Sequence, residues 1–144
     1  MPLKGIIQLH NNSSLKYAQT AVIIVAAGRG HRAGGGMPKQ YRDLGGEMVL
    51  RKTLKCFMTG QEGFGTIAVV IHPDDEELYA QAVSGLDTHI VSVHGGATRT
   101  ASVKAGLMAL ANTETPPTHV LIHDAARPFL TKHTIEHVCD ALDT

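Results

Sequence analysis

Four short apolar runs alternate with amphipathic segments along this chain, and this alternation limits the fold more than any other feature. The runs are rich in Val and Ile and cover residues 21–26, 67–71, 90–93 and 120–122. Continuous apolarity without an alternating pattern is typical of parallel strands that are buried on both faces. Because a helical pattern follows each run, the order predicts an α/β fold with a doubly wound, mostly parallel sheet and helices on both faces.

Apolar residues at helical spacing define the segments between the strands. The first helix covers residues 49–58 and is expected to end at Gly60. Asp74 and Glu77 have the spacing of a capping box at the start of the second helix. The apolar faces expected for the last two helices are Val103, Leu107 and Leu110 in the third, and Ile135, Val138 and Leu142 in the fourth.

A chain of 144 residues suits one domain, which we place at residues 21–144, after an N-terminal extension of residues 1–20. The 13 Lys and Arg balance the 13 Asp and Glu, so the basic surplus of a nucleic-acid-binding protein is missing. No apolar run approaches the about 18 residues of a membrane helix, and residues 1–20 lack the apolar centre of a signal peptide. These two observations predict no nucleic-acid or membrane partner. Cys56 and Cys139 fall on expected helix faces, which predicts reduced thiols and a cytoplasmic protein.

Positive charge and glycine are concentrated directly after the first strand. Glycines occur at positions 28, 30, 34, 35 and 36, interleaved with Arg29, Arg32 and Lys39, and the first carboxylate of the chain is Asp43. A dinucleotide-binding fingerprint is disfavoured, because the glycine triplet and Pro38 would break the helix that must begin there. A Walker loop is excluded by the absence of G-K-[ST]. We interpret the segment as a phosphate-wrapping loop of backbone amides and separate cations, with a solvated surface loop as the alternative.

Polar residues follow every expected strand. The segments are AAGRGHR, HPDD, HGGATR and HDAARP, in chain order. Because parallel strands present their carboxyl ends at one edge of the sheet, these segments are expected to meet there and form a ligand site.

Three motifs along the chain resemble one enzyme family. They are A-A-G-x-G-x-R at residues 26–32 with P-K-Q-Y at 38–41, G-G-x-x-R-x-x-S-V-x-x-G-L at 95–107, and H-D-A-A-R-P at 123–128. The first is similar to the loop of sugar-nucleotide pyrophosphorylase-type nucleotidyltransferases. Together the three resemble the 2-C-methyl-D-erythritol 4-phosphate cytidylyltransferase family, which implies a Rossmann-like nucleotidyltransferase fold over residues 21–144.

The resemblance implies a reaction and a set of site residues. In this family CTP and a sugar-alcohol phosphate give a CDP-alcohol and pyrophosphate, a step of non-mevalonate isoprenoid biosynthesis. By the resemblance, Arg32 and Lys39 stabilise the transition state, and Asp124 helps to hold Mg²⁺ or another divalent cation. The other substrate-binding residues that the resemblance implies are Ala26, Ala27, Gly28, Gly30, Gly96, Ser102, Ala125 and Arg127.

Some features depart from the family pattern or leave alternatives open. Ala97 stands where some relatives have an acidic residue, so base selectivity is looser or shared with backbone groups. The family's catalytic domain is longer, and we therefore expect the chain to be a truncated, CTP-binding part with negligible transfer activity by itself. The N-terminal extension of residues 1–20 suits a bifunctional enzyme in which this domain is fused to the cyclodiphosphate synthase. The full-length enzyme is expected to be a homodimer. A ribitol-5-phosphate cytidylyltransferase and a non-catalytic nucleotide-binding fragment remain alternatives.

Several single residues have a second interpretation. His72, His94 and His123 each end an expected strand, and we favour hydrogen bonding at the loop entrances over a zinc site. Asp124 has the alternative role of a turn cap, and Arg127 that of a loop anchor.

Overall fold

The computed structural model describes residues 17–29, 36–58, 63–86 and 89–142. Strands and helices alternate as the sequence predicts. In chain order the elements are β1 (Thr20–Ala26), η1 (Lys39–Tyr41), α2 (Val49–Met58), β2 (Ile67–Ile71), η2 (Pro73–Asp75), α3 (Glu76–Val83), β3 (Ile90–His94), α4 (Arg99–Ala111), β4 (His119–Asp124) and α5 (Lys132–Ala141).

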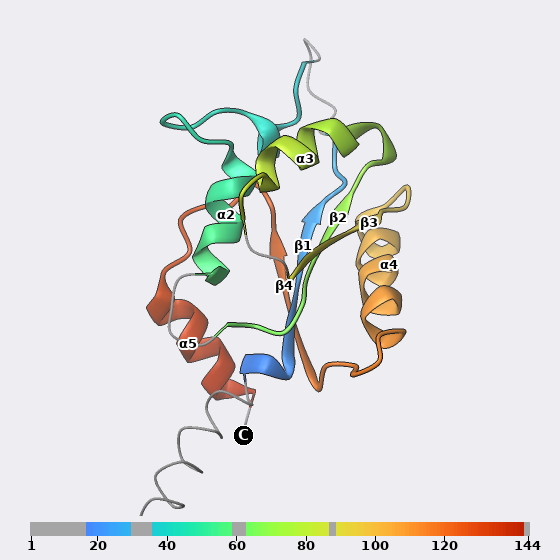
Figure 1. The fold of residues 1–144 in the computed structure, drawn as a ribbon, viewed down its shortest axis with the longest axis vertical. Coiled ribbons are helices and arrows are strands. Elements are labelled where there is room, and N and C mark those ends of the chain that lie inside the picture. The colour runs from blue at the N-terminus through green and yellow to red at the C-terminus, as the bar shows by residue number, and fades with distance from the viewer. Residues whose placement is uncertain (1–16, 30–35, 59–62, 87–88, 143–144) are drawn as a thin grey trace, which may run out of the picture.

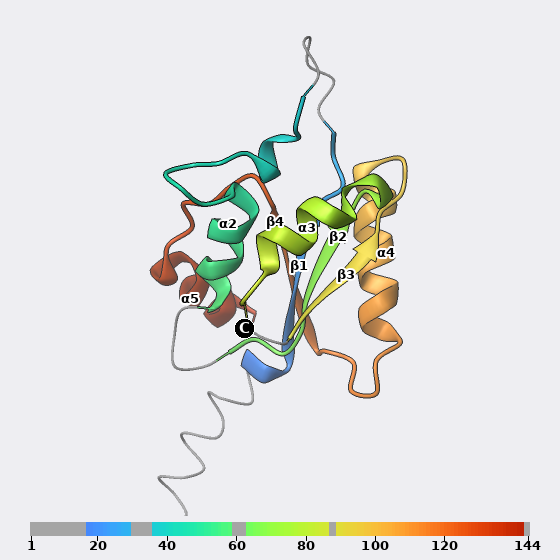
Figure 2. The ribbon, with the colours of Figure 1, turned by 45° about the horizontal axis from the view of Figure 1, so that its top comes forward.

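The strands form one parallel sheet in the order β3-β2-β1-β4. Val22 of β1 is in register with Ile67 of β2 on one side and with Leu121 of β4 on the other. Helix α4 covers one face of this sheet, while α2, α3 and α5 lie on the opposite side (Figures 1 and 2). The predicted α/β class, with a parallel sheet and helices on both faces, is therefore confirmed.

The prediction that every strand is buried on both faces is wrong for two of them. β2 is buried along its whole length and β1 at every residue except Val25. β3 and β4 are half-buried or exposed, and the exposed fraction of Val91 is 45%. The reason is their place in the sheet, because each has a hydrogen-bonded neighbour strand on one side only among the described residues.

Each face of the sheet contributes alternate side chains to its own core cluster. Val22, Ile24 and Val69 pack with Leu50 and Leu54 of α2 on one face. On the other face the buried members are Ala21, Ile23, Ala68, Val70 and Leu110. The predicted apolar face of α2 is confirmed, whereas Gly60, its expected end, lies outside the described residues.

Helix α4 packs against the sheet through smaller residues than expected. Its buried positions are Ser102, Gly106 and Leu110, whereas the exposed fraction of Leu107 is 42%. A Cβ atom at Gly106 would lie 3.1 Å from side-chain atoms of both Ile23 and Val70. The helix therefore approaches the strands closely along a face of small side chains.

The expected face of the fourth helix and the expected start of the second also differ from the structure. In α5 Ile135 is buried as predicted, together with Cys139, whereas Val138 is 42% exposed and Leu142 is the C-cap. The capping box at Asp74 is wrong, since a 3-10 turn precedes α3 and the N-cap of this helix is Asp75. Cys56 and Cys139 are not joined by a disulfide bond, as predicted. Among the described residues, no helix combines the length and the apolar character needed to cross a bilayer.

Candidate functional site

A cavity of about 280 Å³ opens at the carboxyl ends of the strands. The polar segments after β1, β3 and β4 meet there, at the upper edge of the sheet in Figure 1. The residues that line it are Val25, Ala27, Gly28, Gln40, Gly96, Ala97, Thr98, Arg99, Ser102 and Asp124. Three of the four polar segments thus line the cavity, and the fourth, after β2, contacts the first segment through Arg29 without lining the cavity.

The glycine pair after β3 is required by close packing around the cavity. A Cβ atom at Gly95 would lie 2.6 Å from the Cβ of Ala27 and from the Oγ of Ser102. One at Gly96 would lie 2.5 Å from the Cβ of Ala101. Contacts this short exclude any side chain, so the backbone of residues 95 and 96 can run directly beside β1 and the first turn of α4.

The N-terminus of α4 faces the same cavity. Thr98 is its N-cap, and the Thr98 Oγ1 accepts a hydrogen bond of 3.0 Å from the amide of Ala101. Ser102, whose exposed fraction is 2%, accepts a 3.2 Å hydrogen bond from the amide of Gly96. Ser102 therefore holds the glycine pair against the helix, and the positive end of the helix dipole points toward the cavity.

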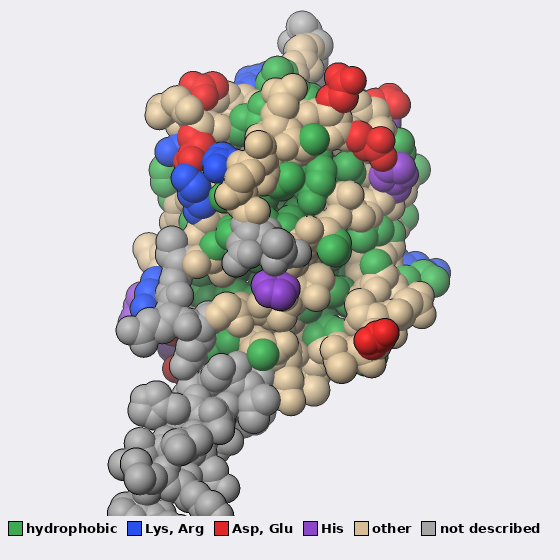
Figure 3. All heavy atoms as spheres, in the orientation of Figure 1, with side chains coloured by type: hydrophobic (Ala, Val, Ile, Leu, Met, Phe, Trp, Pro, Cys, Tyr) green, Lys and Arg blue, Asp and Glu red, His purple; other side chains and the backbone are tan. Residues whose placement is uncertain are grey.

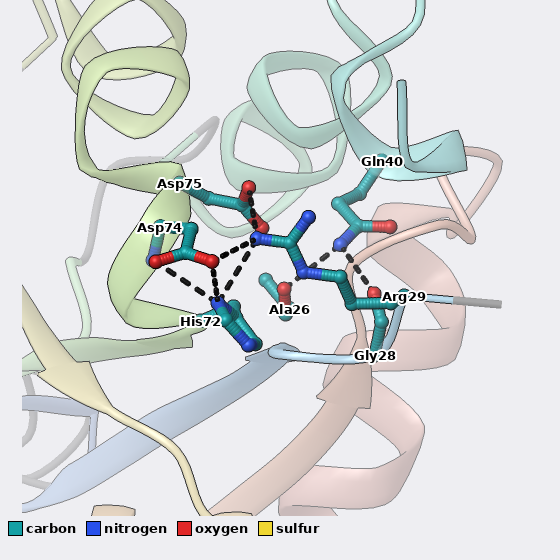
Figure 4. Close-up of polar contacts among 7 residues, drawn as sticks. All are labelled: Ala26, Gly28, Arg29, Gln40, His72, Asp74 and Asp75. Carbon is teal, nitrogen blue, oxygen red and sulfur yellow. Dashed lines mark hydrogen bonds and ion pairs between the residues drawn. The ribbon is translucent and has the colours of Figure 1, made fainter. Parts of the chain in front are cut away.

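Gln40 connects the two described ends of the glycine-rich segment. Its Nε2 donates to the carbonyl of Ala26 at 2.8 Å and to the carbonyl of Gly28 at 3.0 Å (Figure 4). The side chain is buried, whereas the neighbouring Lys39 is exposed at the start of η1. Sequence reasoning missed Gln40, although its place beside Lys39 in the P-K-Q-Y motif was a usable signal.

Asp124 has one carboxylate oxygen engaged in the turn after β4. Its Oδ1 accepts a 2.9 Å hydrogen bond from the amide of Ala126, which is the turn-cap interaction that we considered for this residue. Asp124 also lines the cavity, so the same side chain is available to a ligand there. Ala125 is buried, with its carbonyl accepting a 2.8 Å hydrogen bond from the Thr53 Oγ1.

The structure brings together only part of the predicted site. Ala27, Gly28, Gly96, Ser102 and Asp124 line the cavity. Ala26 and Ala125 belong to the core beneath it, and Lys39 and Arg127 are exposed residues outside the lining set. Gly30 and Arg32 lie outside the described residues. The functional roles of all these residues stay predictions.

The three strand-end histidines make hydrogen bonds, as we favoured. His72 accepts from the amide of Asp74 at 3.0 Å, His94 lies 2.6 Å from a carboxylate oxygen of Glu76, and the Nε2 of His123 lies 2.9 Å from the carbonyl of Arg127. Within the described ranges, no three His, Cys, Asp or Glu side chains are grouped so that they could hold a metal ion.

Charges of both signs lie on the face drawn in Figure 3, with basic and acidic side chains mixed over α2. Glu47 contacts Arg51, Lys52 and Lys55 there, and the hydrogen bond from Lys55 is the main cause that lowers the pKa of Glu47. Arg29 is also paired, with Asp74 and Asp75. The positive charge expected from Arg29 is therefore largely neutralised by carboxylates that follow β2.

The architecture is that of a nucleotidyltransferase domain, as in solved structures that are 29% and 26% identical to this chain. A nucleotidyl transferase from Methanothermobacter shares the fold, with a TM-score of 0.61 at 21% identity over 84% of this chain and 56% of that one. Residues 20–144 match the family of 2-C-methyl-D-erythritol 4-phosphate cytidylyltransferase (IspD), and the chain belongs to that family. The resemblance seen in the sequence motifs is thereby confirmed.

Relatives of known name agree with this assignment. The bifunctional enzyme IspD/IspF of Paramagnetospirillum magneticum is 54% identical over 126 residues, which are 88% of this chain and 32% of that enzyme. The crystal structure of 4-diphosphocytidyl-2C-methyl-D-erythritol synthase from Anaerococcus prevotii gives a TM-score of 0.71 at 29% identity, over 87% of this chain and 51% of that one. This chain thus spans about a third of the curated relative and about half of the solved synthase.

Proposed function

We propose that this chain carries the CTP-binding site of an enzyme that transfers a cytidylyl group to 2-C-methyl-D-erythritol 4-phosphate and releases pyrophosphate. One observation carries the proposal. The three motifs that define the family resemblance supply Gly28, Gly96 and Asp124 to a single cavity, although they are separated by long stretches of sequence. Membership of the cytidylyltransferase family supports the same activity.

The cavity wall suits a planar base that is read by backbone groups. Ala27, Gly28 and Gly96 leave their peptide groups accessible, because none has a side chain larger than a methyl group. Ala97 lines the same cavity and supplies no polar side-chain atom of its own. Selection of cytosine therefore relies on donors and acceptors of the cavity backbone. The side chains of Ser102 and Gln40 fix the position of this backbone through their hydrogen bonds to Gly96 and Ala26.

Cytidylyl transfer depends mainly on positioning and charge. The acceptor phosphate attacks the α-phosphorus of CTP, and pyrophosphate leaves from the opposite side, so the protein needs no nucleophile of its own. Lys39, and by the family resemblance Arg32, supply cations that stabilise the charge on the phosphorus in the transition state. Gln40 fixes the backbone next to Lys39 through its two hydrogen bonds to β1 and Gly28.

The donor set fits Mg²⁺ bound together with a nucleotide. Asp124 is the one acidic side chain among the described residues that line the cavity, and Mg²⁺ commonly binds through one or two carboxylates with substrate phosphates and water as its other ligands. Asp124 would hold the ion, which when bound neutralises part of the triphosphate charge. A structure of an Rv0371c protein from Mycobacterium tuberculosis, which shares the fold at 21% identity, contains manganese.

Calorimetric titration of the chain with the four nucleoside triphosphates in Mg²⁺ tests the proposal. We expect CTP to bind about tenfold more tightly than ATP or GTP, which corresponds to about 1.4 kcal/mol of selective contacts. Removal of Mg²⁺ with a chelator and the Asp124→Asn substitution should each weaken CTP binding. Equal affinity for all four nucleotides would contradict the cytidine assignment. Comparison of 2-C-methyl-D-erythritol 4-phosphate with ribitol 5-phosphate as acceptors separates the two cytidylyltransferase reactions.

A further inference from the structure

The buried carboxylate of Asp75 does not cap the helix that it precedes. Asp75 is the N-cap residue of α3, a position where Asp normally accepts hydrogen bonds from the first helical amides, yet it makes no such bond. Its side chain is only 3% exposed. A buried charge without that capping interaction needs another partner to offset the loss of hydration.

Arg29 is this partner, and it comes from the glycine-rich segment. Its Nη2 donates to the Asp75 Oδ1 at 2.9 Å and lies 2.9 Å from the Nδ1 of His72 (Figure 4). The Nδ1 of His72 also accepts from the amide of Asp74, so it is the unprotonated nitrogen of that ring. Arg29 therefore donates to two acceptors that are fixed at the corner after β2.

The neighbouring carboxylate of Asp74 provides an internal comparison. It lies 3.7 Å from the same Nη2 of Arg29, but its side chain is 78% exposed. Exposed ion pairs contribute little because water and salt screen them, whereas a buried charge depends strongly on its partner. The pair with Asp75 is thus the contact that holds Arg29.

The second oxygen of Asp75 points to another contact. Within the described part of the chain, the Asp75 Oδ2 and the Tyr41 hydroxyl are the buried side-chain polar atoms without a hydrogen-bond partner. Tyr41 ends a 3-10 turn that packs against α3, the helix that Asp75 directly precedes. In agreement with this packing, burial and, next in size, the charge of Asp75 raise the pKa of Tyr41. Because the two atoms do not bond each other directly, we expect one water molecule to accept from the hydroxyl and donate to the carboxylate.

We propose that Asp75 is a positioning residue that ties both described ends of the glycine-rich segment, Arg29 before it and Tyr41 after it, to the corner that follows β2. Tyr41 ends the same 3-10 turn that begins with Lys39, and α3 packs against this turn. Asp75 itself does not line the cavity. It acts through the backbone, by fixing where Lys39 is presented to the nucleotide, and in this respect the inference rests on the proposed function.

Asp75→Asn, with Asp74→Asn as the matched control, tests the proposal in two measurements. The first is amide hydrogen exchange without nucleotide, followed at Tyr41 and Arg42, whose amides bond to the carbonyls of Pro38 and Lys39. We expect these amides to lose protection in Asp75→Asn, with α4 unchanged, and to keep it in Asp74→Asn. The second is titration with Mg²⁺ and CTP, where Asp75→Asn should bind at least about fivefold more weakly, a factor typical of coupled groups.

Unchanged protection of Tyr41 and Arg42 in Asp75→Asn would overturn the inference, as would an equal loss in α4. If the wild-type chain does not bind CTP, the proposed function fails, while the exchange measurement still decides whether Asp75 holds the segment. Should Asp75→Asn not fold, Arg29→Gln removes the ion pair with Asp75, and Tyr41→Phe removes the hydroxyl that we propose to satisfy the second oxygen of Asp75. Each is then expected to loosen the residues around Tyr41, and full protection in both would refute the role.

Discussion

At the scale of single residues, Lys39 and Gln40 divide two tasks between neighbouring positions. Gln40 is buried and bonds to the carbonyls of Ala26 and Gly28, whereas the ammonium group of Lys39 is exposed. A buried anchor beside a free cation allows the cation to be held in place without being neutralised. The contrast with Arg29, which is paired with Asp75, makes Lys39 the better candidate for contact with phosphate.

Lys39→Ala should therefore reduce turnover more than substrate binding. A cation that contacts the phosphorus mainly in the transition state contributes on the order of 3 kcal/mol, so kcat is expected to fall about 100-fold with a smaller rise in KM. Arg32→Ala should behave in the same way. Pyrophosphate release at varied CTP concentration measures both parameters. Lys104→Ala removes an exposed charge from α4 and serves as the control. A wild-type kcat in Lys39→Ala would show that the segment has been assigned wrongly.

The sequence predicted residues that lie in the motifs of the family resemblance and missed residues that are held by distant contacts. Gly96 and Ser102 were expected through the resemblance, and the structure places both in the cavity lining. The 2.5 Å approach of a Cβ at position 96 to the Cβ of Ala101 explains the glycine there. Asp75 entered the sequence analysis only as part of the polar H-P-D-D segment after the second strand, with no role of its own. Its partner Arg29 is 46 residues away, and nothing in the local pattern indicates that the two meet.

At the scale of helices and strands, apolar spacing predicted the existence of the elements better than the faces that they bury. The pattern works for α2, where Leu50 and Leu54 face the sheet. It fails for α4, because Gly106 lies at the closest approach to Ile23 and Val70 and excludes larger side chains. A sequence pattern that scores apolar size cannot show that a helix is packed through its smallest residues.

Gly106→Leu should destabilise the domain by about 1–3 kcal/mol, the usual cost of overpacking a filled core. The added side chain would have to displace Ile23 or Val70, since even a Cβ atom lies 3.1 Å from both. Met108→Ala on the same helix is the control, because Met108 is 56% exposed and its loss should change stability by no more than about 0.5 kcal/mol. Urea unfolding of both variants checks this. Equal midpoints would mean that α4 can move away from the sheet at little cost.

At the scale of the whole molecule, the order of the strands in the sheet explains which strands are buried. β1 and β2 are central and buried, whereas β3 and β4 flank them and are partly exposed. The sequence showed four apolar runs of similar character, and their order in the sheet was not predictable from them. Pairing between β1 and β4 joins segments about 100 residues apart, which only the tertiary structure determines.

One buried tyrosine, Tyr41, and one partly buried tyrosine, Tyr79, on the α2 and α3 side of the sheet should make the whole domain sensitive to alkaline pH. Burial raises the pKa of Tyr79, and burial followed by the charge of Asp75 raises the pKa of Tyr41, above the ordinary value of about 10. In the folded chain these phenols stay protonated at a pH where the unfolded chain has already lost the protons. Since the unfolded state then binds fewer protons, the free energy of unfolding must fall as pH rises.

The stabilising contribution is therefore complete below about pH 10 and is lost progressively above it. Urea unfolding of the wild type at increasing pH should show a midpoint that declines beyond this value. Tyr41→Phe should decline less steeply, because it removes the group with the largest rise in pKa, while Tyr79 retains a smaller effect. Lysine deprotonation acts on both proteins alike, so the difference between their slopes isolates Tyr41. Parallel curves would show that the Tyr41 hydroxyl ionises as easily in the folded chain as in the unfolded one, and that it does not lie buried beside the negative charge of Asp75.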